Sequence, residues 1–94
     1  MDLGIAGRVA LVTGASRGLG FAAAEALAAE GCRVAISARD PDRLAAAAAR
    51  IGAHPVVADM SDPEGPATAV AAVERELGPV DILVANAGGP PTGR

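Results

Sequence analysis

Residues 13–20 read Thr-Gly-Ala-Ser-Arg-Gly-Leu-Gly, and this spacing of glycines is typical of a loop that binds phosphate. Gly14 permits a sharp turn, Gly18 leaves space where the backbone approaches a pyrophosphate, and Gly20 lets a following helix pack closely. The free N–H groups in the first turn of that helix face the anion, and the helix dipole favours negative charge there. The residues expected to form this site are Gly14, Ser16, Arg17, Gly18, Leu19 and Gly20.

The surroundings of this loop favour a dinucleotide site over a purely structural glycine-rich turn. An apolar run precedes the loop, a helical pattern follows it, and a second apolar run begins near Arg33. A Walker-type nucleotide loop is excluded, because it needs Gly-Lys-Ser/Thr at the start of the helix. The chain contains no lysine, since all 8 of its basic residues are arginine.

The end of the second apolar run is the position that would select the cofactor. Folds that bind NAD usually place Asp or Glu about 20 residues beyond the glycines, where the carboxylate binds the ribose hydroxyls. Here Ser37 and Arg39 occupy that neighbourhood, and a guanidinium suits a 2′-phosphate through its charge and paired donors. Asp40 could face the ribose, but it precedes a proline, so we favour its interpretation as a helix cap. Arg39, with Arg17 from the loop, favours NADP(H) over NAD(H), unless Arg39 is only a solvated surface charge.

Two further groups follow the third and fourth apolar runs. Asp59 could accept a hydrogen bond from an adenine amino group, with Met60 beside the ring, or it could be a turn residue ahead of Ser61. Asn86-Ala87-Gly88 could hold a loop shape and leave room for a ribose, or it could form a strand-ending turn. The sequence leaves both pairs of alternatives open.

Four apolar runs predict the strands that carry these groups. Each run is continuous rather than alternating, as in strands that are covered on both faces of a parallel sheet. The runs are residues 9–12, 34–36, 56–58 and 80–84.

Three segments with helical spacing separate these runs. The first helix is expected from about Leu19 to Glu30, and the second follows an Asp40 cap and ends at Gly52. A third start is predicted at residues 61–64, which have capping-box spacing, and Gly78-Pro79 ends that helix. The order β-α-β-α-β-α-β predicts an α/β fold with a doubly wound parallel sheet. We expect residues 1–94 to form a single incomplete domain that ends after its fourth strand.

The composition excludes several other classes of protein. Apolar residues make up 51% of the 94 residues and charged residues 20%, which excludes a disordered tail. A net charge of −3 argues against a nucleic-acid surface, and no apolar run approaches the roughly 18 residues of a membrane span. Cys32 is the only cysteine, so neither a disulfide nor a metal site is expected. No signal peptide is apparent, so we expect a soluble, cytoplasmic protein.

Together, Thr13-Gly14-x-x-x-Gly18-x-Gly20, Asp59 and Asn86-Ala87-Gly88 resemble the N-terminal half of a short-chain dehydrogenase/reductase, across essentially the whole chain. The chain is similar in particular to bacterial 3-oxoacyl-acyl-carrier-protein reductases. The resemblance implies a Rossmann-type fold, an NAD(P)-dependent oxidoreductase and a homo-oligomer at full length. It also implies that Arg17 and Arg39 follow the NADP-preferring pattern, and that Asp59 contacts adenine.

The catalytic groups that the resemblance implies have no counterpart in these 94 residues. The family's Tyr-x-x-x-Lys and upstream Ser lie past the fourth strand, whereas this chain has no Tyr or Lys. Its three serines, Ser16, Ser37 and Ser61, lie in earlier elements, so we assign no catalytic residue and no metal ligand. One interpretation is the cofactor-binding fragment of an enzyme that moves hydride between NADP(H) and a carbonyl or alcohol substrate. The alternatives are a stand-alone dinucleotide-binding module and a non-functional remnant.

The length of the chain also bears on its stability. A domain of this size buries only somewhat over 60% of its unfolded surface, so its stability is marginal. Without a fifth strand, residues 82–84, Ile-Leu-Val, would form an apolar sheet edge with open backbone groups. We therefore expect self-association or marginal folding of the isolated chain.

Overall fold

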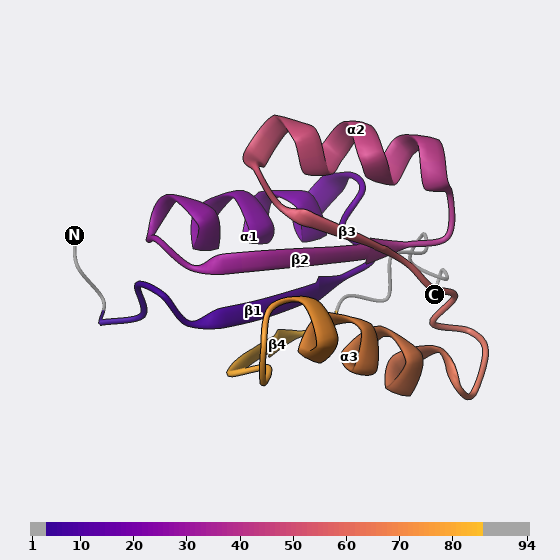
Figure 1. Cartoon of the computed structure of the whole chain (residues 1–94). Helices are drawn as coiled ribbons and strands as arrows, with labels where there is room; N and C mark the ends of the chain where they lie inside the picture. Colours follow the sequence, from indigo (N-terminus) through magenta and orange to yellow (C-terminus); the bar gives the residue numbers. More distant parts are fainter. Residues whose placement is uncertain (1–3, 86–94) are drawn as a thin grey trace, which may run out of the picture.

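The structure, a computed structural model, describes residues 4–85, in which strands and helices alternate (Figure 1). The elements in chain order are β1 (Val9–Thr13), α1 (Gly18–Ala29), β2 (Arg33–Ala38), α2 (Pro41–Ile51), β3 (His54–Val57), α3 (Gly65–Glu76) and β4 (Ile82–Val84). The predicted β-α-β-α-β-α-β order is confirmed. Apart from the start of α3, the boundaries fall within about two residues of the predicted ones, which is the ordinary uncertainty of element ends.

The four strands form one parallel sheet in the order β3-β2-β1-β4. The chain winds outward from β1 to β3 and then returns to the other side of β1, so its direction reverses between β1 and β4. Helices α1 and α2 therefore cover one face of the sheet, and α3 covers the other (Figure 1). This arrangement is the predicted doubly wound, Rossmann-type fold.

Two apolar cores lie on the two faces of the central strand β1, whose five residues are all buried. Ala10 and Val12 belong to the core beneath α1 and α2, together with the fully buried Leu44 of α2. Val9 and Leu11 point the other way and belong to the core beneath α3. Because side chains alternate between faces and both faces are covered, this strand is continuously apolar in sequence.

Helix α2 begins and ends where its sequence signals predict. Gly52 follows its last residue in the left-handed conformation, with φ 70° and ψ 30°, and the next N–H, of Ala53, donates to the Ala48 carbonyl. Glycine adopts this conformation without the steric cost that a Cβ would bring, so it ends the helix cleanly. The buried face carries Leu44 and Ala48, with Ile51 half-buried, as the spacing predicts.

The predicted start of the third helix at residues 61–64 is wrong. The carboxylate of Asp59 accepts hydrogen bonds from Ser61, and that of Asp62 accepts one from the Glu64 N–H at 2.9 Å. These side chains form two successive turns instead of a capping box, and α3 begins at Gly65 with Pro66 in its first turn. Aspartate often makes such local bonds to N–H groups two residues ahead, which compete with helix formation.

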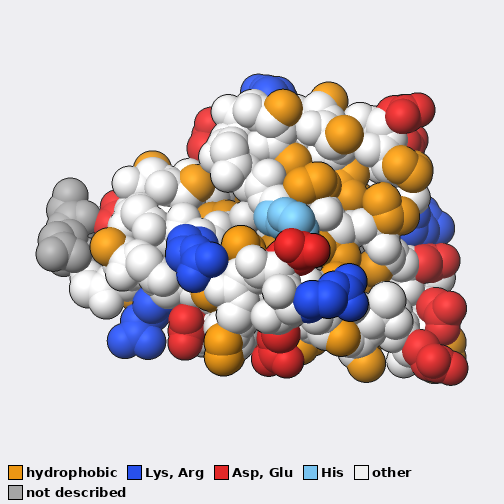
Figure 2. Space-filling model, in the orientation of Figure 1, with side chains coloured by type: hydrophobic (Ala, Val, Ile, Leu, Met, Phe, Trp, Pro, Cys, Tyr) orange, Lys and Arg blue, Asp and Glu red, His pale blue; other side chains and the backbone are white. Residues whose placement is uncertain are grey.

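The described surface mixes charged and apolar side chains. On the face seen in Figure 2, basic and acidic side chains are interspersed, and apolar ones gather over α2 and β3. The large apolar side chains that are exposed are Leu19, Val57 and Leu83. Within residues 4–85, no helix combines the length and apolar character needed to cross a membrane.

Candidate functional site

The residues expected to bind a ligand follow the carboxyl ends of parallel strands, which all lie at one edge of the sheet. The loop of residues 14–17 follows β1, Arg39 follows β2, and Asp59 lies two residues beyond β3. The chain reverses its winding direction between β1 and β4, and the carboxyl ends of these two strands lie at this same edge. In doubly wound sheets, ligands bind at such a reversal point.

The glycine-rich loop presents the N-terminus of α1 at this edge. Gly14 and Gly18 have φ values of 62° and 65°, a region that residues with a Cβ rarely adopt. Arg17 precedes the helix in an extended conformation with no side-chain cap, and the first turn of α1 contains no acidic residue. The backbone N–H groups at this helix start and the positive end of its dipole are therefore suited to an anion.

Packing fixes this loop against the sheet. The Ala15 N–H donates to the Ser37 carbonyl of β2 at 3.1 Å, and the Ala15 side chain is completely buried. Gly20 is also buried, where α1 lies against the sheet. By contrast, Arg17 is exposed and Leu19 is 85% exposed, so both side chains project into solvent from this packed loop. The half-buried Ser16 lies between Ala15 and Arg17.

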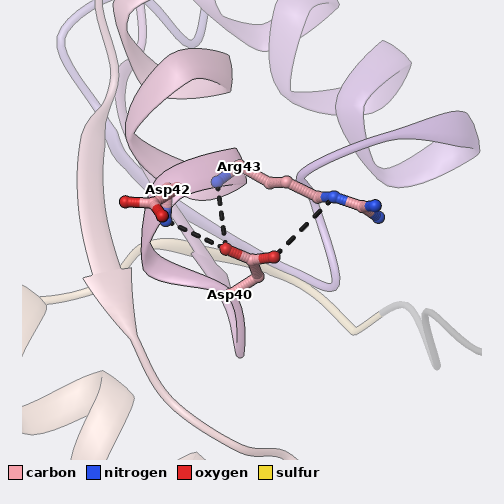
Figure 3. A network of polar contacts seen from close by, with 3 residues as sticks. All are labelled: Asp40, Asp42 and Arg43. Atoms are coloured by element: carbon pink, nitrogen blue, oxygen red, sulfur yellow. Dashed lines mark hydrogen bonds and ion pairs between the residues drawn. The ribbon is translucent and has the colours of Figure 1, made fainter.

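Asp40 caps α2, as the sequence predicts (Figure 3). Its Oδ1 accepts hydrogen bonds from the Asp42 and Arg43 N–H groups at 3.0 and 3.2 Å. Its Oδ2 lies 3.7 Å from Arg43 Nε. Asp40 Oδ1 is therefore used by the helix cap. The neighbouring Arg39 is exposed and takes no part in this cap.

Asp59 forms a turn with Ser61 at the same edge. Asp59 Oδ1 accepts hydrogen bonds from the Ser61 N–H at 2.9 Å and from the Ser61 hydroxyl at 2.6 Å. The hydroxyl bond and then the N–H bond lower the pKa of the Asp59 carboxyl; desolvation opposes them, and the charge of Arg39 lowers the pKa to a lesser extent. Asp59 is therefore an exposed carboxylate with a fixed orientation and a cation nearby. The turn interpretation of Asp59 is confirmed, and contact with adenine stays a prediction.

An apolar hollow adjoins this edge on the α3 face of β1 and β4, with a volume of about 370 Å³. The residues around it are Leu11, Thr13, Met60, Pro66, Val70, Leu83 and Ala85. Met60, predicted to lie beside an adenine ring, is half-buried in this wall. Sequence reasoning missed the hollow, because no local pattern shows that α3 leaves part of β4 uncovered. Leu83 is 56% exposed as a result.

Sequence reasoning also missed Asp81, which sets the register of β4. Asp81 Oδ2 accepts a hydrogen bond from the Val9 N–H at 2.9 Å, and the Asp81 N–H donates to the Val9 carbonyl, also at 2.9 Å. Pairing then runs from Ala10 opposite Ile82 to Val12 opposite Val84. The only available signal was an acidic residue inside the apolar run of residues 80–84. Asn86-Ala87-Gly88, predicted to follow this strand, lies outside the described residues.

The model of the short chain dehydrogenase family matches residues 8–94 of this chain. The chain belongs to the short-chain dehydrogenase family. The resemblance predicted from the glycine motif, Asp59 and Asn86-Ala87-Gly88 is thus confirmed.

Two curated relatives illustrate how much of such an enzyme the chain covers. Gluconate 5-dehydrogenase of Gluconobacter oxydans is 42% identical over 89 residues, which are 89% of this chain and 35% of that protein. The 3-oxoacyl-[acyl-carrier-protein] reductase of Escherichia coli is 42% identical over 84 residues, with 87% and 34% covered. The chain therefore spans about a third of the length of these two relatives.

Solved structures of other short-chain dehydrogenases have the same fold. L-Sorbose reductase from Gluconobacter frateurii, complexed with NADPH and L-sorbose, has a TM-score of 0.84 at 39% identity. That comparison covers 100% of this chain and 38% of the reductase. A variant of actinorhodin polyketide ketoreductase with NADPH also has a TM-score of 0.84, at 38% identity, with 94% and 36% covered.

The described part of the chain brings together backbone amides, exposed cations and one oriented carboxylate. Those groups can bind an anionic ligand that also carries hydrogen-bond donors. No three His, Cys, Asp or Glu side chains within residues 4–85 lie close enough together to hold a metal ion.

Proposed function

We propose that these residues form the nicotinamide-dinucleotide site of a short-chain dehydrogenase. In the whole protein, the reaction would be hydride transfer between NADP(H) and a carbonyl or alcohol substrate. The observation that carries the proposal is the uncapped N-terminus of α1, presented by Gly14 and Gly18 at the sheet edge where the chain reverses. Membership of the family supports it.

Each group at the edge would bind a different part of the dinucleotide. The N–H groups of residues 18–20 in the first turn of α1, with Ser16, would hold the pyrophosphate, and Gly14 would shape the loop that presents them. Asp59 and Met60 would contact the adenine, and Asn86-Ala87-Gly88 would lie near a ribose. The bound cofactor supplies the hydride, whereas this chain's own residues bind and orient it. No residue of this chain is proposed as an acid, a base or a nucleophile.

Arg39 and Arg17 would make NADP(H) the preferred cofactor. Asp40 is committed to the cap of α2, so the ribose 2′ position would meet a guanidinium instead of a carboxylate. A guanidinium binds phosphate through paired donors and charge. The reductases of known structure that resemble this chain in complexes with NADPH support the same preference.

A second candidate function is dinucleotide binding without turnover by these 94 residues alone. The lack of Tyr and Lys anywhere in the sequence favours it. Under this proposal the chain binds NADPH but gives no detectable reduction of any carbonyl compound. Turnover by the purified chain would contradict it.

Calorimetric titration with NADPH and NADH tests the proposed site, and Arg39→Asp tests the preference. One hydrogen bond to a charged group contributes roughly 1.5–3 kcal/mol, so the variant should weaken NADPH binding by about tenfold or more, with little loss for NADH. Arg33→Asp is the matched control, because it makes the same charge change at the opposite end of β2. An unchanged ratio of the two affinities in Arg39→Asp would remove this residue from cofactor selection. No binding of either cofactor to folded protein would refute the site itself.

A further inference from the structure

The contact between Ser61 and Asp59 fixes which carboxylate oxygen faces a ligand. Both Ser61 groups donate to the same atom, Asp59 Oδ1, the hydroxyl at 2.6 Å and the N–H at 2.9 Å. Among residues 4–85, no group donates to Asp59 Oδ2. Two donors on one oxygen hold the plane of the carboxylate and leave the other oxygen for an external donor.

The backbone of Asp59 is also fixed by hydrogen bonds. The Asp62 N–H donates to the Asp59 carbonyl at 3.1 Å, and the Gly65 N–H donates to the Asp62 carbonyl at 2.8 Å. Gly65 is buried against the backbone carbonyl of Asp59. A Cβ at Gly65 would overlap that carbonyl oxygen and lie 2.8 Å from the carbonyl carbon. The first residue of α3 therefore packs directly against the backbone of the turn, and this packing restricts the position of the Asp59 carboxylate.

The two hydrogen bonds from Ser61 keep this carboxylate in its acceptor-only form. The hydrogen bonds from Ser61 and the nearby Arg39 lower the pKa of Asp59, so it is ionised at neutral pH. An ionised carboxylate accepts from an amino group and repels a carbonyl oxygen. In a purine, that difference distinguishes a 6-amino group from a 6-oxo group.

We propose that Ser61 is a positioning residue for purine recognition: by occupying Asp59 Oδ1 with two donors, it directs Oδ2 at the 6-amino group of the ligand's purine. The inference rests on the proposed dinucleotide site and adds a residue that the site's own motif does not contain. Without the Ser61 hydroxyl the carboxylate rotates more freely, and discrimination between 6-amino and 6-oxo purines falls. A purely structural role for Ser61 would instead change the affinity for both purines equally.

The test uses NADPH and its hypoxanthine counterpart, which has a 6-oxo group in place of the amino group. Calorimetric titration of the wild-type protein should give a preference for NADPH of about tenfold, the contribution of one hydrogen bond to a charged group. Ser61→Ala should reduce the preference to about threefold or less, and Ser61→Thr should retain it. Thr68→Ala is the matched control, because it removes an exposed hydroxyl from α3.

A second variant, Asp59→Asn, makes the test independent of affinity losses. Its carbonyl oxygen can still accept from Ser61, so its amide nitrogen would take the place of Oδ2 and present donors. The purine preference should then reverse, and the double variant Asp59→Asn with Ser61→Ala should lose that reversal. Urea melts of each variant show whether it is folded.

Three results would overturn the inference. These are no purine preference in the wild-type protein, an equal loss for both ligands in Ser61→Ala, and no reversal in a folded Asp59→Asn variant. Each leaves the dinucleotide site intact, because the wild-type protein still binds NADPH. Absence of NADPH binding would instead refute the proposed function as well.

Discussion

Asp81→Ala should destabilise the fold through the central strand β1. The carboxylate of Asp81 is the acceptor for the Val9 N–H, and Val9 is only 4% exposed. Removing the acceptor leaves a buried N–H without a partner, which costs roughly 1–3 kcal/mol. Because Asp81 itself is exposed, water can replace part of the lost bond, so we expect about 2 kcal/mol. Asp81→Asn keeps an oxygen acceptor and should cost less than about 1 kcal/mol.

Urea unfolding followed by circular dichroism measures this effect. With a denaturant slope of about 1 kcal/mol per molar for a chain of this size, Asp81→Ala should lower the midpoint by about 2 M. Glu25→Ala is the charge-matched control, because Glu25 is exposed in the middle of α1. Hydrogen exchange at Val9 should also accelerate in the alanine variant. If Asp81→Ala and Glu25→Ala lowered the midpoint equally, the proposed anchoring of β4 to β1 would be refuted.

Two further predictions concern buried residues beneath the site. Ser37→Ala should stabilise the fold by about 1 kcal/mol, since the buried Ser37 hydroxyl has no hydrogen-bond partner in the part of the chain that the structure describes. A lower urea midpoint for this variant would show that the hydroxyl is satisfied. Gly65→Ala should cost about 2 kcal/mol or more and weaken NADPH binding, because its Cβ would displace the Asp59 carbonyl. Unchanged stability and binding would show that this backbone can shift freely.

The sequence predicts the architecture well where one local signal dominates. The glycine spacing after Val12 predicts a tight turn into a helix, and Asp40-Pro41 and Gly52 predict the start and the end of the next helix. The structure has each of these backbone features. Continuous apolar runs likewise predict the four strands, and β1 is buried on both faces as expected. The expected cover on both faces is wrong for β3 and β4, whose Val57 and Leu83 are exposed because these two strands lie at the borders of the sheet.

The prediction fails where two local signals compete. Ser61 to Glu64 has the spacing of a capping box, but Asp59 and Asp62 both bond forward to nearby N–H groups, so the chain turns twice before α3 begins. The role of Asp81 depends on Val9, which is 72 residues away, and no local pattern shows such a pair. The apolar hollow depends in the same way on which part of β4 the helix α3 leaves open.

The proline in strand β3 makes the two borders of the sheet unequal. The Ala58 N–H donates toward β2, to the Ala38 carbonyl, so by alternation the nitrogens of residues 55 and 57 point away from the sheet. Pro55 has no hydrogen to donate there, which leaves Val57 as the outward donor of this short strand. A further strand would therefore find few backbone donors beside β3. In β4 the Asp81 N–H points toward β1, so by alternation the N–H groups of residues 82 and 84 point outward and remain able to donate. Growth of this sheet, by added chain or by a second molecule, is directed to a single side.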